Sequence, residues 1–174
     1  MNKMLQAVRP PAPAGVEEDA FFMAEALHQA RQAYRAGEVP VGALVVLEGQ
    51  VIARAHNRVQ ALQQATAHAE LLALQAAFDQ AGAKYLPQAT LYVTLEPCPM
   101  CAGALYWAQV GRLCFGASDA QRGYQRWATP LLHPKTRVAQ GLLAAQSTQL
   151  LHSFFHALRQ SPAKIACAAH PTPL

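Results

Sequence analysis

The sequence has little charge and few aromatic residues for its length. Charged residues make up 14% and aromatic residues 7% of its 174 residues, whereas hydrophobic residues make up 52%. A chain with so few charges and so many apolar residues can bury enough surface to offset the entropy it loses on folding. This composition therefore excludes an intrinsically disordered or fibrous protein, and the length predicts one ordinary domain.

Long apolar runs are also missing. No run reaches the roughly 18 residues of a membrane-spanning helix, and residues 1–9 contain no hydrophobic stretch long enough for a secretory signal. We therefore expect a cytoplasmic protein without a membrane partner. Cysteine is scarce as well, with four in the chain, but two of them, Cys98 and Cys101, lie close together. In a reducing compartment such a pair indicates a metal site or a redox motif.

Acidic residues are nearly absent from the second half of the chain. Residues 97–174 contain seven Lys and Arg and one acidic residue, Asp119, whereas residues 1–96 contain seven basic and nine acidic residues. Clustered positive charge attracts polyanions such as nucleic acids. The second half is therefore a candidate nucleic-acid surface, although a moderately basic protein without such a partner would carry the same charge.

Proline and small residues gather at both ends of the chain, where they cannot build a packed element. We expect residues 1–18 and 161–174 to be disordered tails and residues 19–160 to form one domain without internal repeats. Met23, Leu27 and Ala30 share one face of a first helix, which Asp19 would cap. The remaining elements are expected at 41–47, 51–55, 67–81, 89–95, 99–109, 112–117, 137–140 and 141–159. This order predicts an α/β protein with helices on both faces of a central mixed sheet.

Two short motifs carry the chemistry, and each stands at the start of an expected helix. They are HAE, with His68 and Glu70, and PCPMC at 97–101, with Cys98 and Cys101. One imidazole and two thiolates suit Zn²⁺ and leave its fourth tetrahedral position open, as in catalytic zinc sites. The helix N-termini are expected to lower the pKa of both thiols. A redox pair or half of a structural zinc knuckle are weaker explanations of the two cysteines.

A proton carrier is also needed, because hydrolysis by a zinc-activated water requires a group that takes a proton to the leaving group. Glu70 lies two residues after His68, so its side chain points away from the ligand direction and is free to face a substrate. The combination of H-x-E with P-C-x-x-C is the signature of the zinc nucleobase deaminases. We therefore predict one zinc ion held by His68, Cys98 and Cys101, with Glu70 as the catalytic residue.

Longer segments resemble the bacterial tRNA-specific adenosine deaminases over about residues 20–160. The matching segments are GEVPVGA at 37–43, Asn57, TAHAE at 66–70, TLYVTLEPCPMCAGA at 90–104, FGASD at 115–119 and LLHSFF at 150–155. The resemblance implies a three-layer α/β/α cytidine-deaminase-like fold with a central mixed five-stranded sheet. It also implies a homodimer with one zinc per subunit that deaminates adenosine to inosine at the wobble position of a tRNA anticodon loop.

The same resemblance implies roles for four substrate-binding residues. Asn57 would hydrogen-bond to the target nucleotide, and the backbone around Ala69 would read the purine. Asp119 would contact the neighbouring nucleotide. Phe154 would pack or stack against the flipped bases of the anticodon loop, as in other single-stranded RNA recognition.

The chain departs from the family pattern at positions that are expected to affect substrate specificity. Ser118 stands where many members have a basic residue, and residues 123–127 (GYQRW) replace a run of small residues. Four basic residues could contact phosphates from other positions, namely Arg122, Arg126, Lys135 and Arg137. Trp107 and Trp127 could stack on bases, although for Trp107 we expect packing in the core or in a dimer interface instead.

Two other functions are compatible with the sequence. One is deamination of a free base or nucleoside such as guanine, adenine or cytosine, and the other is a non-catalytic, zinc-stabilised RNA-binding subunit. The basic second half favours RNA over a free base, which has no phosphates to attract. Glu70 favours an enzyme, because a scaffold has no need of an acid beside an open metal position.

Overall fold

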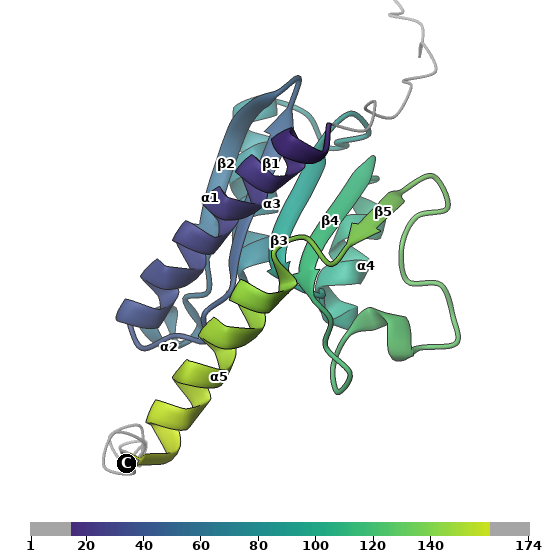
Figure 1. The fold of residues 1–174 in the computed structure, drawn as a ribbon. Coiled ribbons are helices and arrows are strands. Elements are labelled where there is room, and N and C mark those ends of the chain that lie inside the picture. Colours follow the sequence, from purple (N-terminus) through teal and green to yellow (C-terminus); the bar gives the residue numbers. More distant parts are fainter. Residues whose placement is uncertain (1–14, 161–174) are drawn as a thin grey trace, which may run out of the picture.

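A mixed five-stranded sheet forms the centre of the computed structural model, which describes residues 15–160 (Figure 1). Its order is β2-β1-β3-β4-β5, with β1 antiparallel to β2 and β3, and with β3, β4 and β5 parallel. The bounds of the strands are β1 Gly42–Leu47, β2 Gln50–His56, β3 Thr90–Leu95, β4 Arg112–Ala117 and β5 Arg137–Gln140. The α/β class and the mixed five-stranded sheet are thus confirmed.

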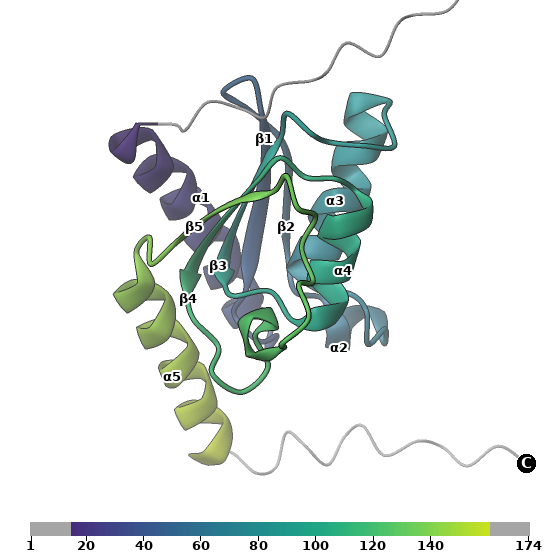
Figure 2. The ribbon, with the colours of Figure 1, turned by 90° about the vertical axis from the view of Figure 1, so that its right-hand side faces the viewer.

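Helices cover both faces of this sheet, so the molecule has three layers (Figure 2). Helix α1 (Val16–Arg35) and helix α5 (Ala144–Gln160) lie on one face, and α3 (Ala69–Ala81) and α4 (Pro99–Trp107) lie on the other. A four-residue helix, α2 (Val59–Leu62), and a 3-10 helix (Tyr124–Arg126) were not predicted. Both are single turns within connections, too short to show a periodic apolar pattern.

Alternating side chains divide the apolar residues of the strands between two cores. In β1, Leu44 and Val46 face α1, whereas Ala43 and Val45 face the α3 side. The core beneath α1 also contains Phe22, Met23, Ala26, Tyr92 and Cys114. The larger core beneath α3 and α4 also contains Ala73, Leu74, Leu91, Val93, Leu105, Leu113 and Phe115. β1, β3 and β4 are therefore buried on both faces, whereas β2 and β5, at the two edges of the sheet, are partly exposed.

Helix α1 begins earlier than predicted, and Asp19 does not cap it. The helix starts at Val16 with Gly15 as its N-cap, so the predicted tail boundary at residue 18 is wrong. Asp19 lies inside the helix and is 6% exposed. Its carboxylate accepts two hydrogen bonds from the Arg112 guanidinium, at 2.7 and 2.6 Å, and one from the Tyr92 hydroxyl at 2.6 Å. The sequence pattern could not show this role, because the partner lies 93 positions away.

Several other predictions can be compared with the structure. Residues 1–14 and 161–174, where the tails are predicted, lie outside the described residues. Trp107 is 77% exposed, so it does not lie in the core, and a dimer interface, the other place predicted for it, stays a prediction. Among residues 15–160, no helix combines the length and the apolar character needed to cross a bilayer.

The buried ion pair predicts a pH-dependent contribution to stability. Burial disfavours the charged form of Asp19, but the hydrogen bonds from Arg112 and Tyr92 outweigh it and lower the pKa of Asp19. Asp19→Asn should reduce the free energy of unfolding by about 3 kcal/mol at pH 7, because it leaves a buried guanidinium without a counter-charge. A carboxyl whose pKa is lower in the folded state stabilises above its unfolded pKa, about 3.9, and loses that effect as the pH falls.

Urea denaturation of wild type and variant between pH 7 and pH 3 measures this effect. The difference in unfolding free energy should shrink as the pH falls below about 4. Glu18→Gln, at the preceding and exposed position, is the control and should change stability by less than about 0.5 kcal/mol. A loss that is equal in both variants, or that persists undiminished at pH 3, would contradict the assignment.

Candidate functional site

Two helix starts place the three predicted metal ligands together. His68 is the N-cap residue of α3, and Cys98 is the N-cap residue of α4, with Cys101 in the first turn of that helix. Neither N-cap side chain bonds to its own helix backbone. Cys98 follows the end of β3 by three residues, so the cluster lies at the carboxyl ends of the parallel strands. Ligands bind at this edge in open α/β sheets.

The geometry of the cluster fits one metal ion. The Cys98 Sγ lies 3.7 Å and the Cys101 Sγ lies 3.5 Å from His68 Nδ1. Tetrahedral bonds of about 2.0 Å to nitrogen and 2.3 Å to sulfur require a sulfur-to-nitrogen distance of about 3.5 Å. All three ligand atoms lie within 4.8 Å of one another, and this is the one such cluster that residues 15–160 contain.

The two thiols differ in acidity. Hydrogen bonding with Cys101 lowers the pKa of Cys98 to about 4, so Cys98 is a thiolate at neutral pH. The same hydrogen bond raises the pKa of Cys101, which is completely buried. The expectation that both pKa values are lowered is therefore wrong for Cys101, because one proton shared by two close sulfur atoms stays on the more buried one. A thiolate that exists before binding gives a cation its first attachment point.

Glu70 lies beside the cluster without belonging to it. It is the second residue of α3 and is 4% exposed, and its carboxylate is not among the three grouped donors. Burial raises the pKa of Glu70. A buried carboxyl outside the ligand set is the arrangement that a general acid and base requires.

Asn57 is tied directly to the first turn of α3. It is 7% exposed, and its Oδ1 accepts a hydrogen bond of 2.9 Å from the backbone amide of Ala69, which is completely buried. This bond turns the oxygen of the side-chain amide toward α3 and leaves the Nδ2 group to donate elsewhere. The structure therefore brings Asn57 and Ala69 next to His68 and Glu70.

Two buried glutamates that sequence reasoning missed fix the loops on either side of the cluster. Glu38 is 2% exposed and accepts hydrogen bonds from the backbone amides of Gln60 at 3.2 Å and Ala61 at 2.8 Å. These amides belong to α2, the turn that connects Asn57 with His68. Glu38 thus anchors the segment that carries one metal ligand and the Asn57 side chain.

Glu96 does the same for the loop after β4. It is 5% exposed and accepts hydrogen bonds from the backbone amides of Asp119 and Gln125, both at 2.9 Å. A Cβ atom on Gly123 would lie 2.3 Å from its carboxyl carbon, so only glycine fits there. Both glutamates stand within the matching segments, but no local signal showed that distant amides would bind them.

The two remaining predicted residues lie in the loop after β4 and in α5. Asp119 is partly buried, and its Oδ1 accepts hydrogen bonds of 2.9 Å from the amides of Gln121 and Arg122. Phe154 is 8% exposed and packs edge-on against Tyr34 of α1, with ring centres 5.7 Å apart. The next residue, Phe155, is 40% exposed. The ring that α5 presents to solvent at this point is therefore that of Phe155.

Removing the Glu96 charge should loosen one loop selectively. Glu96→Gln replaces one acceptor oxygen with an NH₂ group that faces a backbone amide, so the Asp119 and Gln125 amides should exchange with solvent at least tenfold faster. Hydrogen exchange with mass spectrometry measures this change. Glu38→Gln is the matched control and should speed exchange at Gln60 and Ala61 instead. Equal exchange of the 119–125 loop in wild type and Glu96→Gln would contradict the anchoring role.

Comparison with known proteins connects this site to a family. The model of the MafB19-like deaminases matches residues 17–159. A tRNA-specific adenosine deaminase of Agrobacterium fabrum is 42% identical over 147 residues, which cover 82% of this chain and 97% of that protein. A solved structure from a study of A-to-I editing by tRNA:A34 deaminases is 43% identical, with a TM-score of 0.71 over 75% of this chain and 99% of that one.

A solved guanine deaminase from Bacillus subtilis is also similar, with 38% identity and a TM-score of 0.54, but it covers 56% of this chain and 63% of its own. The two adenosine deaminases have higher identity, 42% and 43%, and cover more of the chain than this guanine deaminase does. The family model over residues 17–159 includes both helix starts that carry the His-Cys-Cys cluster. This chain belongs to the family of tRNA-specific adenosine deaminases.

Proposed function

We propose that this protein is a zinc-dependent tRNA deaminase that hydrolyses adenosine to inosine at the wobble position of an anticodon loop. One observation carries the proposal. A His-Cys-Cys cluster with the spacing of zinc ligands lies beside a buried glutamate that is not part of it. Membership of the family supports adenosine in tRNA as the substrate, and the cluster supports zinc-dependent hydrolysis as the reaction.

In this mechanism His68, Cys98 and Cys101 would hold one zinc per subunit, which supplies an acidified water when bound. Glu70 transfers one proton of the attacking water to the purine ring and the other proton to the departing amino group. The reaction forms a bond between C6 and oxygen and breaks the bond between C6 and the amino nitrogen, so adenosine and water become inosine and ammonia. Burial of Glu70 keeps bulk water away from this proton transfer.

The substrate contacts follow from the loops around the cluster. Asn57, held by the Ala69 amide, donates through Nδ2 to the target nucleotide, and the peptide groups that flank Ala69 face the purine. Asp119 contacts the neighbouring nucleotide from a loop that Glu96 holds in place. Phe154 supports the RNA-facing side of α5 from its packed position against Tyr34, and its exposed neighbour Phe155 offers the ring for stacking.

An anticodon loop is a suitable substrate because its bases are already unpaired, so extruding one costs less than opening a duplex. Family members act as homodimers, and we propose the same for this chain. The exposed apolar side chains of α4, Met100, Tyr106 and Trp107, support a contact between two copies. The proposed compartment is the cytoplasm, where such a substrate occurs.

Replacing the proton carrier tests the mechanism. Glu70→Ala should keep one zinc per subunit, because Glu70 is not a ligand, and should lose at least 10³-fold in kcat, a loss within the range for general acid–base catalysis. The assay is conversion of a tRNA with adenosine at the wobble position, read as guanosine on sequencing, with zinc content measured by elemental analysis. Asp79→Ala, on the exposed side of the same helix, is the control and should stay active.

Loss of zinc in Glu70→Ala would remove the assignment of Glu70 to proton transfer. If a zinc-loaded wild-type protein does not convert the tRNA, the free-base alternative gains support. Guanine would then be tested first, because a guanine deaminase is among the similar structures.

Salt dependence tests the choice between RNA and a free base. Binding that neutralises four phosphates of single-stranded RNA should weaken about 50-fold between 50 and 200 mM salt, because the logarithmic slope is about −0.7 per phosphate. The four cations are Arg122, Arg126, Lys135 and Arg137. The measurement is the dissociation constant of Glu70→Ala with an anticodon stem-loop. A salt-independent affinity would contradict the RNA assignment.

A further inference from the structure

We infer that a hollow between the 3-10 helix and β5 is a stacking subsite for an unpaired nucleobase of the substrate RNA. This base is a different one from the adenine that reacts. This inference rests on the proposed function, and it concerns the segment 123–127 in which the chain differs from its family. The hollow is open to solvent and has a volume of about 210 Å³, and its walls include Tyr124, Trp127, Leu131 and Val138. That volume is below the roughly 300–1,000 Å³ of sites for drug-sized molecules, and it suits a single planar ring.

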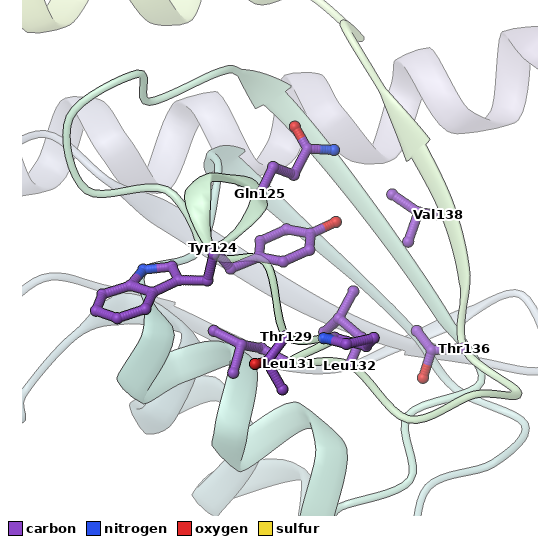
Figure 3. A pocket seen from close by; sticks show the side chains of 9 residues that line it. Tyr124, Gln125, Thr129, Leu131, Leu132, Thr136 and Val138 are labelled. Carbon is purple, nitrogen blue, oxygen red and sulfur yellow. The ribbon is translucent and has the colours of Figure 1, made fainter.

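The walls have the chemistry that a base requires. Trp127 is 60% exposed, so one large aromatic face is available for stacking. Tyr124 is half-buried and packs edge-on against Phe115, with ring centres 6.3 Å apart, which fixes its orientation. In Figure 3 the Tyr124 ring extends toward Thr136 and Val138 on the opposite side of the hollow. Stacking on such rings tolerates every base, because each base has a π face.

Backbone hydrogen bonds hold the hollow against the metal-ligand turn. The amide of Tyr124 donates to the carbonyl of Pro97 at 2.9 Å, and the amide of Gln125 donates to Glu96. Glu96 and Pro97 directly precede Cys98. On the opposite wall, the Thr136 hydroxyl donates to the Val110 carbonyl at 2.7 Å. These hydrogen bonds fix the walls of the hollow, and the one from Tyr124 to Pro97 connects the hollow directly to the residue before Cys98.

Charge distinguishes an RNA occupant from a protein occupant. The segment 118–138 contains four basic residues and one acidic residue, Asp119, whose Oδ1 already accepts two amides of its own loop. The lining itself is uncharged, but Arg126, Lys135 and Arg137 each stand next to a lining residue in the sequence, and a base attached to phosphates needs such cations beside its pocket. A nucleobase therefore fits this hollow better than a second copy of the chain.

The experiment measures RNA affinity in the full-length, zinc-loaded protein by anisotropy of a labelled anticodon stem-loop. Trp127→Ala should weaken binding about tenfold, which is within the range for loss of one stacked base. Trp127→Phe keeps a stacking ring and should restore most of that affinity. Tyr85→Ala removes another exposed aromatic, 43% exposed, in the connection before the start of β3 and thus at the opposite end of that strand from the cluster. This control should bind as the wild type does.

A series of stem-loops with one abasic nucleotide each identifies the occupant. At one position beside the target, the abasic change should weaken wild-type binding about tenfold and should not weaken Trp127→Ala further, because both changes remove the same contact. The inference is overturned if Trp127→Ala binds like the wild type, or if the two losses are additive at every position. It is also overturned if sedimentation shows that Trp127→Ala separates two subunits, because a second copy then covers the hollow.

The binding measurement does not depend on turnover, so the two proposals can fail separately. A wild-type protein that binds the stem-loop through Trp127 but does not deaminate it contradicts the proposed function alone. A wild-type protein that deaminates the stem-loop with no contribution from Trp127 contradicts the subsite alone.

Discussion

The site depends on the first residues of α3 and α4, which lie next to each other. His68 and Cys98 are the N-cap residues of α3 and α4, and their side chains turn away from their own helices toward a common point. An N-cap residue has an extended backbone, so its side chain can point away from the helix that follows. Since α3 and α4 lie on the same face of the sheet, this local rule is enough to bring an imidazole and two thiols within reach of one ion.

Buried contacts elsewhere in the structure hold the starts of α3 and α4 in their relative positions. The strand that precedes α4, β3, is buried on both faces, and a buried ion pair between Asp19 and Arg112 fastens α1 to the first residue of β4. An exposed ion pair would contribute little. This pair is 93 positions apart in the chain and buried, so it joins the first helix to the strand whose far end leads into the Asp119 loop.

Backbone amides, rather than cations, donate hydrogen bonds to the two buried glutamates that anchor the site loops. Glu38 and Glu96 each accept two amides from the loop that they hold. A buried carboxylate is costly unless such donors satisfy it, so each loop has one favoured position. Glu96, together with the Pro97 carbonyl, thereby fixes the turn that precedes the exposed Trp127 against the segment before Cys98.

Local patterns in the sequence predicted the order of the main helices and strands and the members of the His-Cys-Cys cluster, and they indicated Glu70 as the proton carrier that we propose. Apolar spacing and helix-start residues act over a few positions, so they can be read without a fold, and β4 and β5 have the predicted bounds. The tertiary structure alone decided that Asp19 pairs with Arg112, that Glu38 and Glu96 bind amides more than 20 positions away, and that Trp107 is exposed while Phe154 is covered. Each of these depends on contacts between residues that are far apart in the sequence, and no local sequence pattern predicts such contacts.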